Sequence, residues 1–191
     1  MQLIGIDEVG RGCLAGPLLV VAAIATDELP SGLDDSKKLT KTKREELAVA
    51  LLSVCQFGEG WVSPDEINAG GLTSAMRLGV ARALNSLEVL FDSPIIIDGH
   101  INYCPDKYIN VSTIIKADSL VPIVSAASIY AKVARDKYMA QQAVIYPGYG
   151  FEKHMGYGTA HHFKAISNLG VIESLHRRGF APIKTFLETN K

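Results

Sequence analysis

The chain carries short apolar runs separated by longer stretches in which apolar residues recur every three or four positions. Runs of about four to eight residues that are rich in valine and isoleucine are typical of buried strands. By this criterion the sequence predicts strands at 3–7, 18–24, 94–97 and 111–115, with a weaker one at 56–62.

The amphipathic stretches predict helices at 40–54, from Pro64 to the glycines at 70–71, from 73 onward, at about 122–143 and at 159–169. Thr40 or Thr42 is suited to cap the first of these. Ser63 and Glu66 form a capping box around Pro64, which marks a helix start. Gly170 provides the stop for the last helix.

Strands and helices alternate after an opening hairpin, so the pattern predicts a mixed α/β sandwich around one central sheet. The chain has 191 residues and no stretch that resembles a linker, which favours a single domain over residues 1–191. At this length, and with 48% hydrophobic residues, a core forms without disulfide bonds.

Three cysteines, Cys13, Cys55 and Cys104, are spaced far apart and form no C-x-x-C motif. This pattern favours reduced thiols in the cytoplasm over a zinc site or a secreted scaffold. The N-terminus has no basic segment typical of a signal peptide, and the longest apolar run is too short to cross a bilayer. We therefore expect a cytoplasmic protein without a membrane anchor, and we expect it to be a monomer.

The net charge of −1 does not itself favour a nucleic-acid partner, but basic residues gather in two segments. Residues 37–44 hold five basic residues and no acid, and residues 153–184 hold five against one acid together with four of the five histidines. Such segments suit a phosphate-binding face. The more common explanation for charge runs is a solvated helix surface.

Four acids follow predicted strands: Asp7 with Glu8, Asp98 and Asp118. Strand ends of an open α/β sheet lie side by side, so these carboxylates are expected to converge in one crevice. Carboxylates that are brought together raise one another's pKa unless cations share the site. Oxygen ligands without histidine or cysteine suit Mg²⁺ or Mn²⁺, and two such ions activate water for phosphodiester hydrolysis.

The glycine-rich turn at 10–16 follows a strand, as a dinucleotide-binding loop does, but it lacks the G-x-G-x-x-G spacing and a helix behind it. Two acids also stand where a pyrophosphate would approach. These glycines more plausibly bring backbone amides close to a nucleic-acid phosphate or a sugar hydroxyl.

Six blocks of the sequence resemble, in order, the signature blocks of type 2 ribonuclease H. They are GIDEVGRGCLAGPLLVVAA, DDSKKLT, IIIDG, KADSLVPIVSAASIYAKVARD, YGFEKHMGYGTAHH and HRRGFAP. The resemblance implies a ribonuclease H-like α/β fold with a central mixed five-stranded sheet flanked by helices. It also implies a C-terminal helical substrate-binding region from about residue 140.

The resemblance implies an endoribonuclease that cuts the RNA strand of RNA–DNA hybrids and incises 5′ of single ribonucleotides in duplex DNA. The products carry 3′-hydroxyl and 5′-phosphate ends, a chemistry that serves ribonucleotide excision repair. The implied ligands of two Mg²⁺ or Mn²⁺ ions are Asp7, Glu8, Asp98 and Asp118. The implied contacts with the RNA–DNA junction are Gly10, Arg11, Gly12 and Tyr157, which meet the 2′-hydroxyl that distinguishes RNA from DNA.

Two positions depart from the family pattern. Met155 stands where lysine is usual, which puts a phosphate contact in doubt, and Gly179 stands where serine is usual. Three alternatives are weaker: type 3 ribonuclease H, which Arg11 disfavours; an inactive nucleic-acid-binding module, which has no use for repelling carboxylates; and a nucleotide-binding oxidoreductase. The tail after Phe186 contains no recognisable motif for docking on a replication clamp, so that partner stays open.

Overall fold

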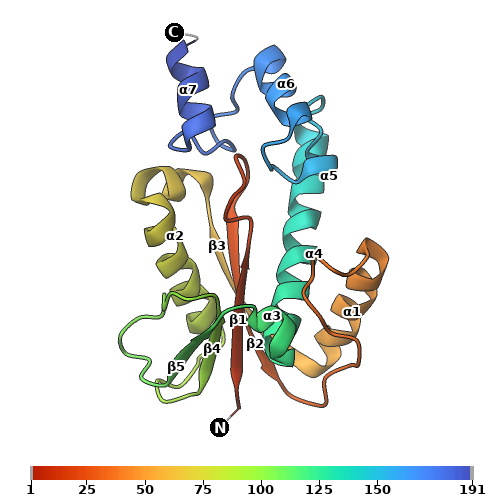
Figure 1. Cartoon of the computed structure of the whole chain (residues 1–191), viewed down its shortest axis with the longest axis vertical. Coiled ribbons are helices and arrows are strands. Elements are labelled where there is room, and N and C mark those ends of the chain that lie inside the picture. Colours follow the sequence, from red (N-terminus) through yellow and green to blue (C-terminus); the bar gives the residue numbers. More distant parts are fainter. Residues whose placement is uncertain (1, 190–191) are drawn as a thin grey trace. The chain divides into compact units, whose positions relative to one another are not determined.

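The computed structural model describes residues 2–189 (Figure 1). Its strands are β1 (Ile4–Val9), β2 (Leu18–Ala25), β3 (Cys55–Val62), β4 (Ile95–Asp98) and β5 (Val111–Ile114). Its helices are α1 (Lys41–Val54), α2 (Pro64–Ser86), α3 (Ala117–Leu120), α4 (Pro122–Ile145), α5 (Phe151–His154), α6 (Ala160–Leu169) and α7 (Ala181–Thr189). All five predicted strands and all predicted helices are present.

The strands form one mixed sheet of five strands in the order β3-β2-β1-β4-β5. β1 and β2 pair antiparallel, whereas β1 with β4 and β4 with β5 pair parallel. The opening hairpin followed by parallel crossovers is the α/β architecture that the sequence pattern predicts.

The two faces of the sheet are covered by different helices, as alternate residues of β3 show. Gly58 and Gly60 lie directly under α2, where an added Cβ would meet the backbone of Ala83 and Gly79. Phe57 points the other way and stacks on Tyr130 of α4 at a ring distance of 4.1 Å. Because successive side chains of a strand point to opposite faces, the sheet lies between α2 and α4.

Local sequence signals fix most helix starts. Thr40, one of the two candidate caps, accepts a hydrogen bond from Lys43 N–H at the start of α1. Ser63 and Glu66 form the predicted capping box, each side chain accepting from the other residue's backbone N–H (3.2 and 2.9 Å). The predicted break at the glycines is present, because Gly71 has a non-helical backbone (φ 73°) that divides α2 into two helical stretches.

Three helices were not predicted: α3, α5 and α7. Two of them, α3 and α5, have only four residues. They are too short to carry a period in the sequence and are held by the surrounding structure.

The chain divides into two compact units. The first comprises the described residues up to 9, then 19–61 and 76–133; the second comprises 10–18, 62–75 and the described residues from 134 onward. The prediction that residues 1–191 form one domain stays a prediction. None of the helices formed by residues 2–189 is both long and apolar enough to span a bilayer.

Candidate functional site

The first unit brings Asp7 and Asp98 onto neighbouring strands. Ile6 of β1 is paired with Ile97 of β4, so the next residue on each strand, Asp7 and Asp98, continues the parallel register. Parallel strands lie about 4.8 Å apart, and residues in register point to the same face. Asp7 lies within β1 rather than after it, because the strand continues to Val9.

Asp118 reaches the same region from α3 rather than from a strand end. The chain leaves β5, turns at Lys116 in the left-handed conformation (φ 61°) and enters α3. The Asp98 carboxylate accepts a hydrogen bond from Ala117 N–H (2.7 Å), which ties the start of α3 to the end of β4. Ser125 donates to the Asp118 carbonyl (2.7 Å) and holds the backbone of α3 in place.

Asp7 and Asp118 have raised pKa values although the ammonium of Lys37 lies near Asp118. Burial raises the pKa of Asp7 well above its ordinary value, with the charges of Glu8 and Asp98 adding to the rise and a hydrogen bond from Ser128 opposing it. Burial also raises the pKa of Asp118, and nearby Asp98 and Asp35 raise it further. A cation bound among these carboxylates would relieve the repulsion.

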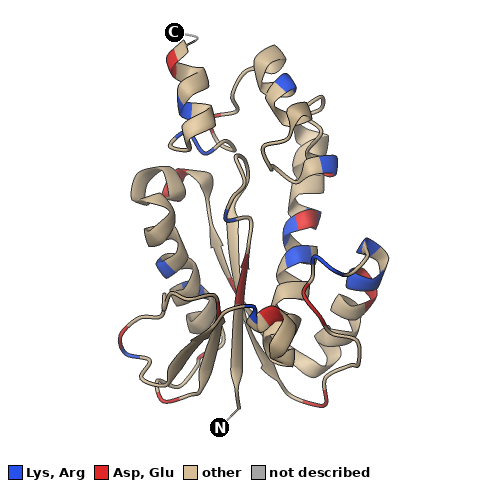
Figure 2. Ribbon diagram, in the orientation of Figure 1, with Lys and Arg blue, Asp and Glu red and all other residues tan. Residues whose placement is uncertain are grey.

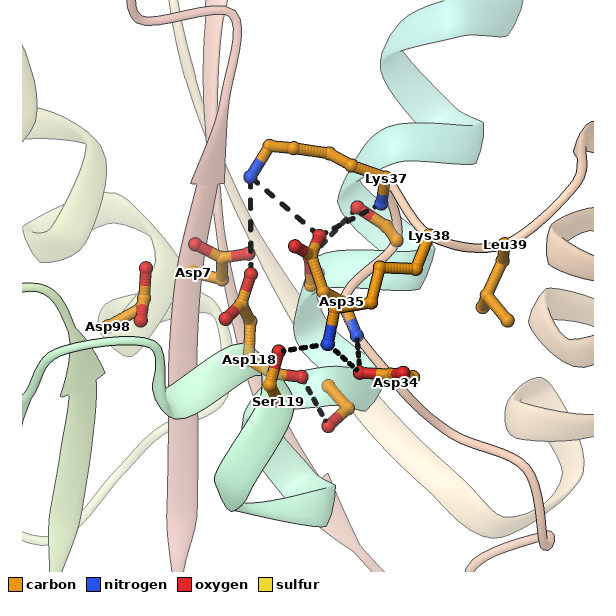
Figure 3. A network of polar contacts seen from close by, with 12 residues as sticks. Asp7, Asp34, Asp35, Lys37, Lys38, Leu39, Asp98, Asp118 and Ser119 are labelled. Carbon is orange, nitrogen blue, oxygen red and sulfur yellow. Dashed lines mark hydrogen bonds and ion pairs between the residues drawn. The ribbon is translucent and has the colours of Figure 1, made fainter.

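A further segment of the first unit, residues 34–38, lies against the acids (Figure 3). The ammonium group of Lys37 is 4.0 Å from Asp118 Oδ2 and 3.8 Å from Asp35 Oδ1. Ser36 is buried and accepts a hydrogen bond from Ser128 (3.0 Å). The segment belongs to the DDSKKLT block, and its two lysines fall in the basic run at 37–44 that was weighed as a phosphate-binding face. The prediction gave no role to Asp34, Asp35 or Ser36.

Among residues 2–189, no three acidic, histidine or cysteine side chains converge closely enough to hold an ion as they stand. The chemistry of the acids nevertheless fits a divalent cation that prefers oxygen ligands, because all three are carboxyl groups and the charge of Asp98 raises the pKa of both Asp7 and Asp118.

The basic run at 37–44 is mostly paired with local acids. Lys38 lies 2.9 Å from Asp34, and Lys41 lies 3.9 Å from Glu45 on the exposed face of α1. Figure 2 shows these charges of both signs on α1 and on the segment that leads into it. Exposed pairs of this kind are a solvated helix surface, the more common explanation for a charge run.

The second unit contains the G-R-G turn, residues 10–12. Gly10 has a positive φ of 86°, and a Cβ there would collide with the guanidinium of Arg135, so the protein itself requires glycine. At Gly12 neither reason applies: its φ is not positive, and a Cβ would meet nothing within 4 Å. Room at an exposed glycine without a packing role suits the close approach of a ligand.

Two arginines of the second unit, Arg135 and Arg177, are completely buried and donate to backbone carbonyls in the G-R-G turn, in the residues that follow it and at Met155. Arg135 donates to the carbonyls of Pro17, Ala15 and Met155 at 2.9–3.2 Å. Arg177 donates to Gly16 (3.0 Å) and Arg11 (2.9 Å), and its Nη2 has no hydrogen-bond partner within residues 2–189. Burying a charge is costly, so the retention of both indicates that the shape of the turn matters.

Tyr157 also lies in the second unit, with 40% of the residue exposed. Burial of part of the side chain and the neighbouring Cys13 raise its pKa to about 12, so its hydroxyl is protonated at neutral pH and able to donate. Its backbone is fixed on both sides: its N–H donates to the His154 carbonyl and its own carbonyl accepts from Thr159 N–H, each at 2.9 Å.

The histidines are structural rather than metal-binding as placed. His154, His162 and His176 are buried and bonded to backbone groups or to each other, while His161 is exposed. Met155 adopts a left-handed conformation (φ 50°) and serves the fold through its carbonyl, which accepts from Arg135. The lysine usual at this position is therefore not needed for that contact.

A protein-family model described as ribonuclease HII matches residues 4–183. The chain belongs to the ribonuclease HII family. A ribonuclease HII from Parvibaculum lavamentivorans is 45% identical over 188 residues, which cover 96% of this chain and 67% of the relative. The chain is thus a metal-dependent ribonuclease that hydrolyses the RNA strand of RNA–DNA hybrids.

Solved structures show the same fold. Ribonuclease H2 from Pyrococcus horikoshii superposes with a TM-score of 0.77 at 26% identity, covering 99% of this chain and 98% of that one. Bst ribonuclease HIII, solved in complex with Mn²⁺, gives a TM-score of 0.75 at 23% identity, covering 100% of this chain and 70% of the other. The predicted ribonuclease H-like fold is confirmed.

Proposed function

We propose that this ribonuclease incises duplex DNA on the 5′ side of a single embedded ribonucleotide, leaving 3′-hydroxyl and 5′-phosphate ends. In this proposal two divalent ions are held by Asp7, Glu8, Asp98 and Asp118, and the 2′-hydroxyl is met by Gly10, Arg11, Gly12 and Tyr157. The observation that carries it is that Asp7 and Asp118 have raised pKa values, caused first by burial and increased by the charge of Asp98, a cost that a bound cation would offset.

The proposed metal ligands come from different elements of the first unit. Asp7 and Asp98 offer oxygens from neighbouring strands, while Asp118 offers them from α3, whose start is tied to Asp98. Bound Mg²⁺ or Mn²⁺ would supply the Lewis acidity that activates water and stabilises the leaving oxygen. The ammonium of Lys37, beside Asp118, balances part of the negative charge of the acids. In this proposal a phosphate of the substrate adds further negative charge near Lys37.

The junction-reading part of the proposal is supported by the open Gly12 and by the protonated hydroxyl of Tyr157. A backbone N–H or C=O at an unobstructed glycine is able to approach a sugar closely, and a tyrosine ring stacks on it. The three cysteines are all free thiols, which supports placing the enzyme in the reducing cytoplasm, where it would serve ribonucleotide excision repair.

The test is cleavage of two matched duplexes, one with a single embedded ribonucleotide and one with an all-RNA strand, with EDTA and after metal return. We expect EDTA to abolish cleavage and Mg²⁺ or Mn²⁺, but not Ca²⁺, to restore it, because Ca²⁺ favours more ligands and looser geometry. Cleavage that persists in EDTA contradicts the metal mechanism. Cleavage of the all-RNA strand alone contradicts the junction function and favours type 3 behaviour.

A further inference from the structure

Three segments of the second unit are bonded to one another through their backbones: 10–18, 154–162 and 172–177. Leu14 N–H donates to the Gly156 carbonyl, and the Leu14 carbonyl accepts from Arg177 N–H, each at 2.8 Å. Ala15 and His176 form an antiparallel bridge between the same segments. The segment 172–177 therefore contacts the G-R-G turn and is close to the segment that carries Tyr157.

The side chain of His176 reaches Tyr157 through His162. His162 Nδ1 is 2.9 Å from the Tyr157 carbonyl, which only accepts, so this nitrogen carries the proton. A neutral His162 then has a bare Nε2, which lies 3.2 Å from His176 Nε2. That contact needs one proton, and His176 must supply it.

The other nitrogen of His176, Nδ1, lies 2.9 Å from Ile172 N and 3.2 Å from the Ile172 carbonyl oxygen. With the proton of His176 on Nε2, the bare Nδ1 accepts from Ile172 N–H, the shorter of the two contacts. The hydrogen bonds therefore run in one direction from Ile172 through His176 and His162 to the Tyr157 carbonyl. Both rings are buried and have depressed pKa values of about 4, caused first by burial, so both are neutral at pH 7.

The next residue, Arg177, donates hydrogen bonds to the G-R-G turn, the other group that is proposed to contact the junction. Its guanidinium donates to the Arg11 carbonyl in the middle of the G-R-G turn and to Gly16. Two adjacent residues thus send their side chains to the two groups that are proposed to read the junction. His176 holds Tyr157 through His162, and Arg177 holds Arg11 directly.

We propose that His176 and Arg177 are positioning residues that set Tyr157 against the G-R-G turn and thereby determine the preference for an embedded ribonucleotide. This inference rests on the proposed function, in which the turn and the tyrosine contact the junction. Neither residue needs to contact the substrate, because each acts through a hydrogen bond to a backbone carbonyl. A loss of either bond should alter substrate choice more than it alters metal binding.

Two substitutions of His176 separate its two hydrogen bonds. His176→Gln places an amide N–H where Nε2 stands, so it keeps the donor to His162 and loses the acceptor for Ile172. His176→Asn places an amide oxygen where Nδ1 stands, so it keeps the bond with Ile172 and loses the one with His162. We expect His176→Asn to lower the ratio of kcat/KM for the one-ribonucleotide duplex over the all-RNA strand by roughly three- to tenfold, and His176→Gln to leave it near wild type.

A second matched pair keeps the test informative if His176→Asn does not fold. His162→Asn retains a donor toward the Tyr157 carbonyl, whereas His162→Gln loses it and retains only the contact with His176. The ratio should fall in both variants, because each breaks one of the two hydrogen bonds that connect His176 to the Tyr157 carbonyl. Arg177→Lys keeps the charge but cannot span two carbonyls, and it should lower the ratio as well.

Asn68→Ala is the control for general loosening of the segment 172–179. Asn68 donates to the His176 carbonyl (3.4 Å) and accepts from Gly179 N–H (3.1 Å), yet it contacts neither side chain of the proposed pair. It should lower the melting temperature and leave the substrate ratio unchanged. A ratio that falls equally in Asn68→Ala, His176→Gln and His176→Asn would show a merely structural role and overturn the proposal.

A readout independent of activity separates this inference from the proposed function. In ¹⁵N NMR spectra of the five histidines, His176 should carry its proton on Nε2 and His162 on Nδ1. The ¹³C shift of the Tyr157 carbonyl should move in His176→Asn and not in His176→Gln. If wild type shows no preference for the embedded ribonucleotide, the proposed function fails. If instead that preference exists and the carbonyl does not respond to His176→Asn, the positioning role fails.

Discussion

Asp7, Asp98 and Asp118 are individually unremarkable residues that become costly only because the fold gathers them. Each raises the pKa of a neighbour or has its own raised by burial and by like charge. For Asp7 and Asp118 the folded pKa lies above the unfolded value, so their ionisation destabilises the metal-free fold and this cost disappears as pH falls through the raised pKa. Stability of the metal-free fold therefore does not account for Asp7 and Asp118.

Asp98→Asn should therefore inactivate the enzyme and stabilise the metal-free protein. The amide oxygen still accepts from Ala117 N–H, so α3 keeps its anchor, while the charge that repels Asp7 and Asp118 is gone. The loss of a metal ligand should reduce kcat by roughly a thousandfold or more. Steady-state kinetics and thermal melts in EDTA measure the two effects.

Asp7→Asn and Asp118→Asn should behave in the same way as Asp98→Asn. Glu45→Gln, on the exposed face of α1, is the control and should change neither activity nor stability appreciably. Near-normal turnover by Asp98→Asn would show that Asp98 is only the end of a strand.

Tyr157 is expected to affect the choice of substrate more than the chemistry. Tyr157→Phe keeps the stacking ring and loses one hydrogen bond, a loss of roughly 1 kcal/mol in binding. Tyr157→Ala also loses stacking, worth about 1–3 kcal/mol by analogy with single-strand binders, and with it most cleavage at single ribonucleotides. Calorimetric titration with Mn²⁺ should give wild-type binding in both variants. Equal cleavage of both duplexes by Tyr157→Ala and wild type would leave the tyrosine a packing role.

At the scale of elements, the G-R-G turn combines one glycine that the fold needs with one that it does not. Gly10→Ala should destabilise the protein by about 1–3 kcal/mol, because it strains a positive φ and meets Arg135. Gly12→Ala should melt like wild type but raise KM for the one-ribonucleotide duplex, because its space is open to a ligand. Thermal melts measure the stability of both variants, and steady-state kinetics measure their KM for the one-ribonucleotide duplex. An unchanged KM in Gly12→Ala would remove this glycine from the substrate contacts.

Whole-molecule stability should weaken as pH falls from about 6.5 toward 4. His162 and His176 have folded pKa values of about 4, below the unfolded value of about 6.5, so the unfolded chain binds more protons in this window and the free energy of unfolding declines. Asp7 and Asp118 act in the opposite direction. The neighbouring imidazoles of His154 and His161 add to the lowering of the His162 pKa.

Urea unfolding at a series of pH values measures this decline, which is on the order of a few kcal/mol for the pair. His176→Gln removes one titrating ring while keeping the donor to His162, so its stability should fall less steeply over the same window. An identical slope in His176→Gln and wild type would show that His176 does not titrate differently in the folded and unfolded states.

The sequence by itself was sufficient to predict the strands and most of the helix starts. Strand-forming runs and caps such as Thr40 and the Ser63–Glu66 box act through neighbours in the chain, so their signals are local. The ordered blocks from Gly5 to Pro182 also determined the family. The acids Asp7, Glu8, Asp98 and Asp118 were named in this way, and their role as metal ligands stays a prediction.

Only the tertiary structure decided which distant residues meet. The register that aligns Asp7 with Asp98, the turn at Lys116 that delivers Asp118, and the line of hydrogen bonds from His176 to Tyr157 all join segments far apart in the chain. Strand pairing and buried polar contacts are set by packing of the whole sheet and core, and a single sequence carries no local pattern for them. For that reason the sequence named candidate site residues, and it did not indicate which buried arginines and histidines contact them.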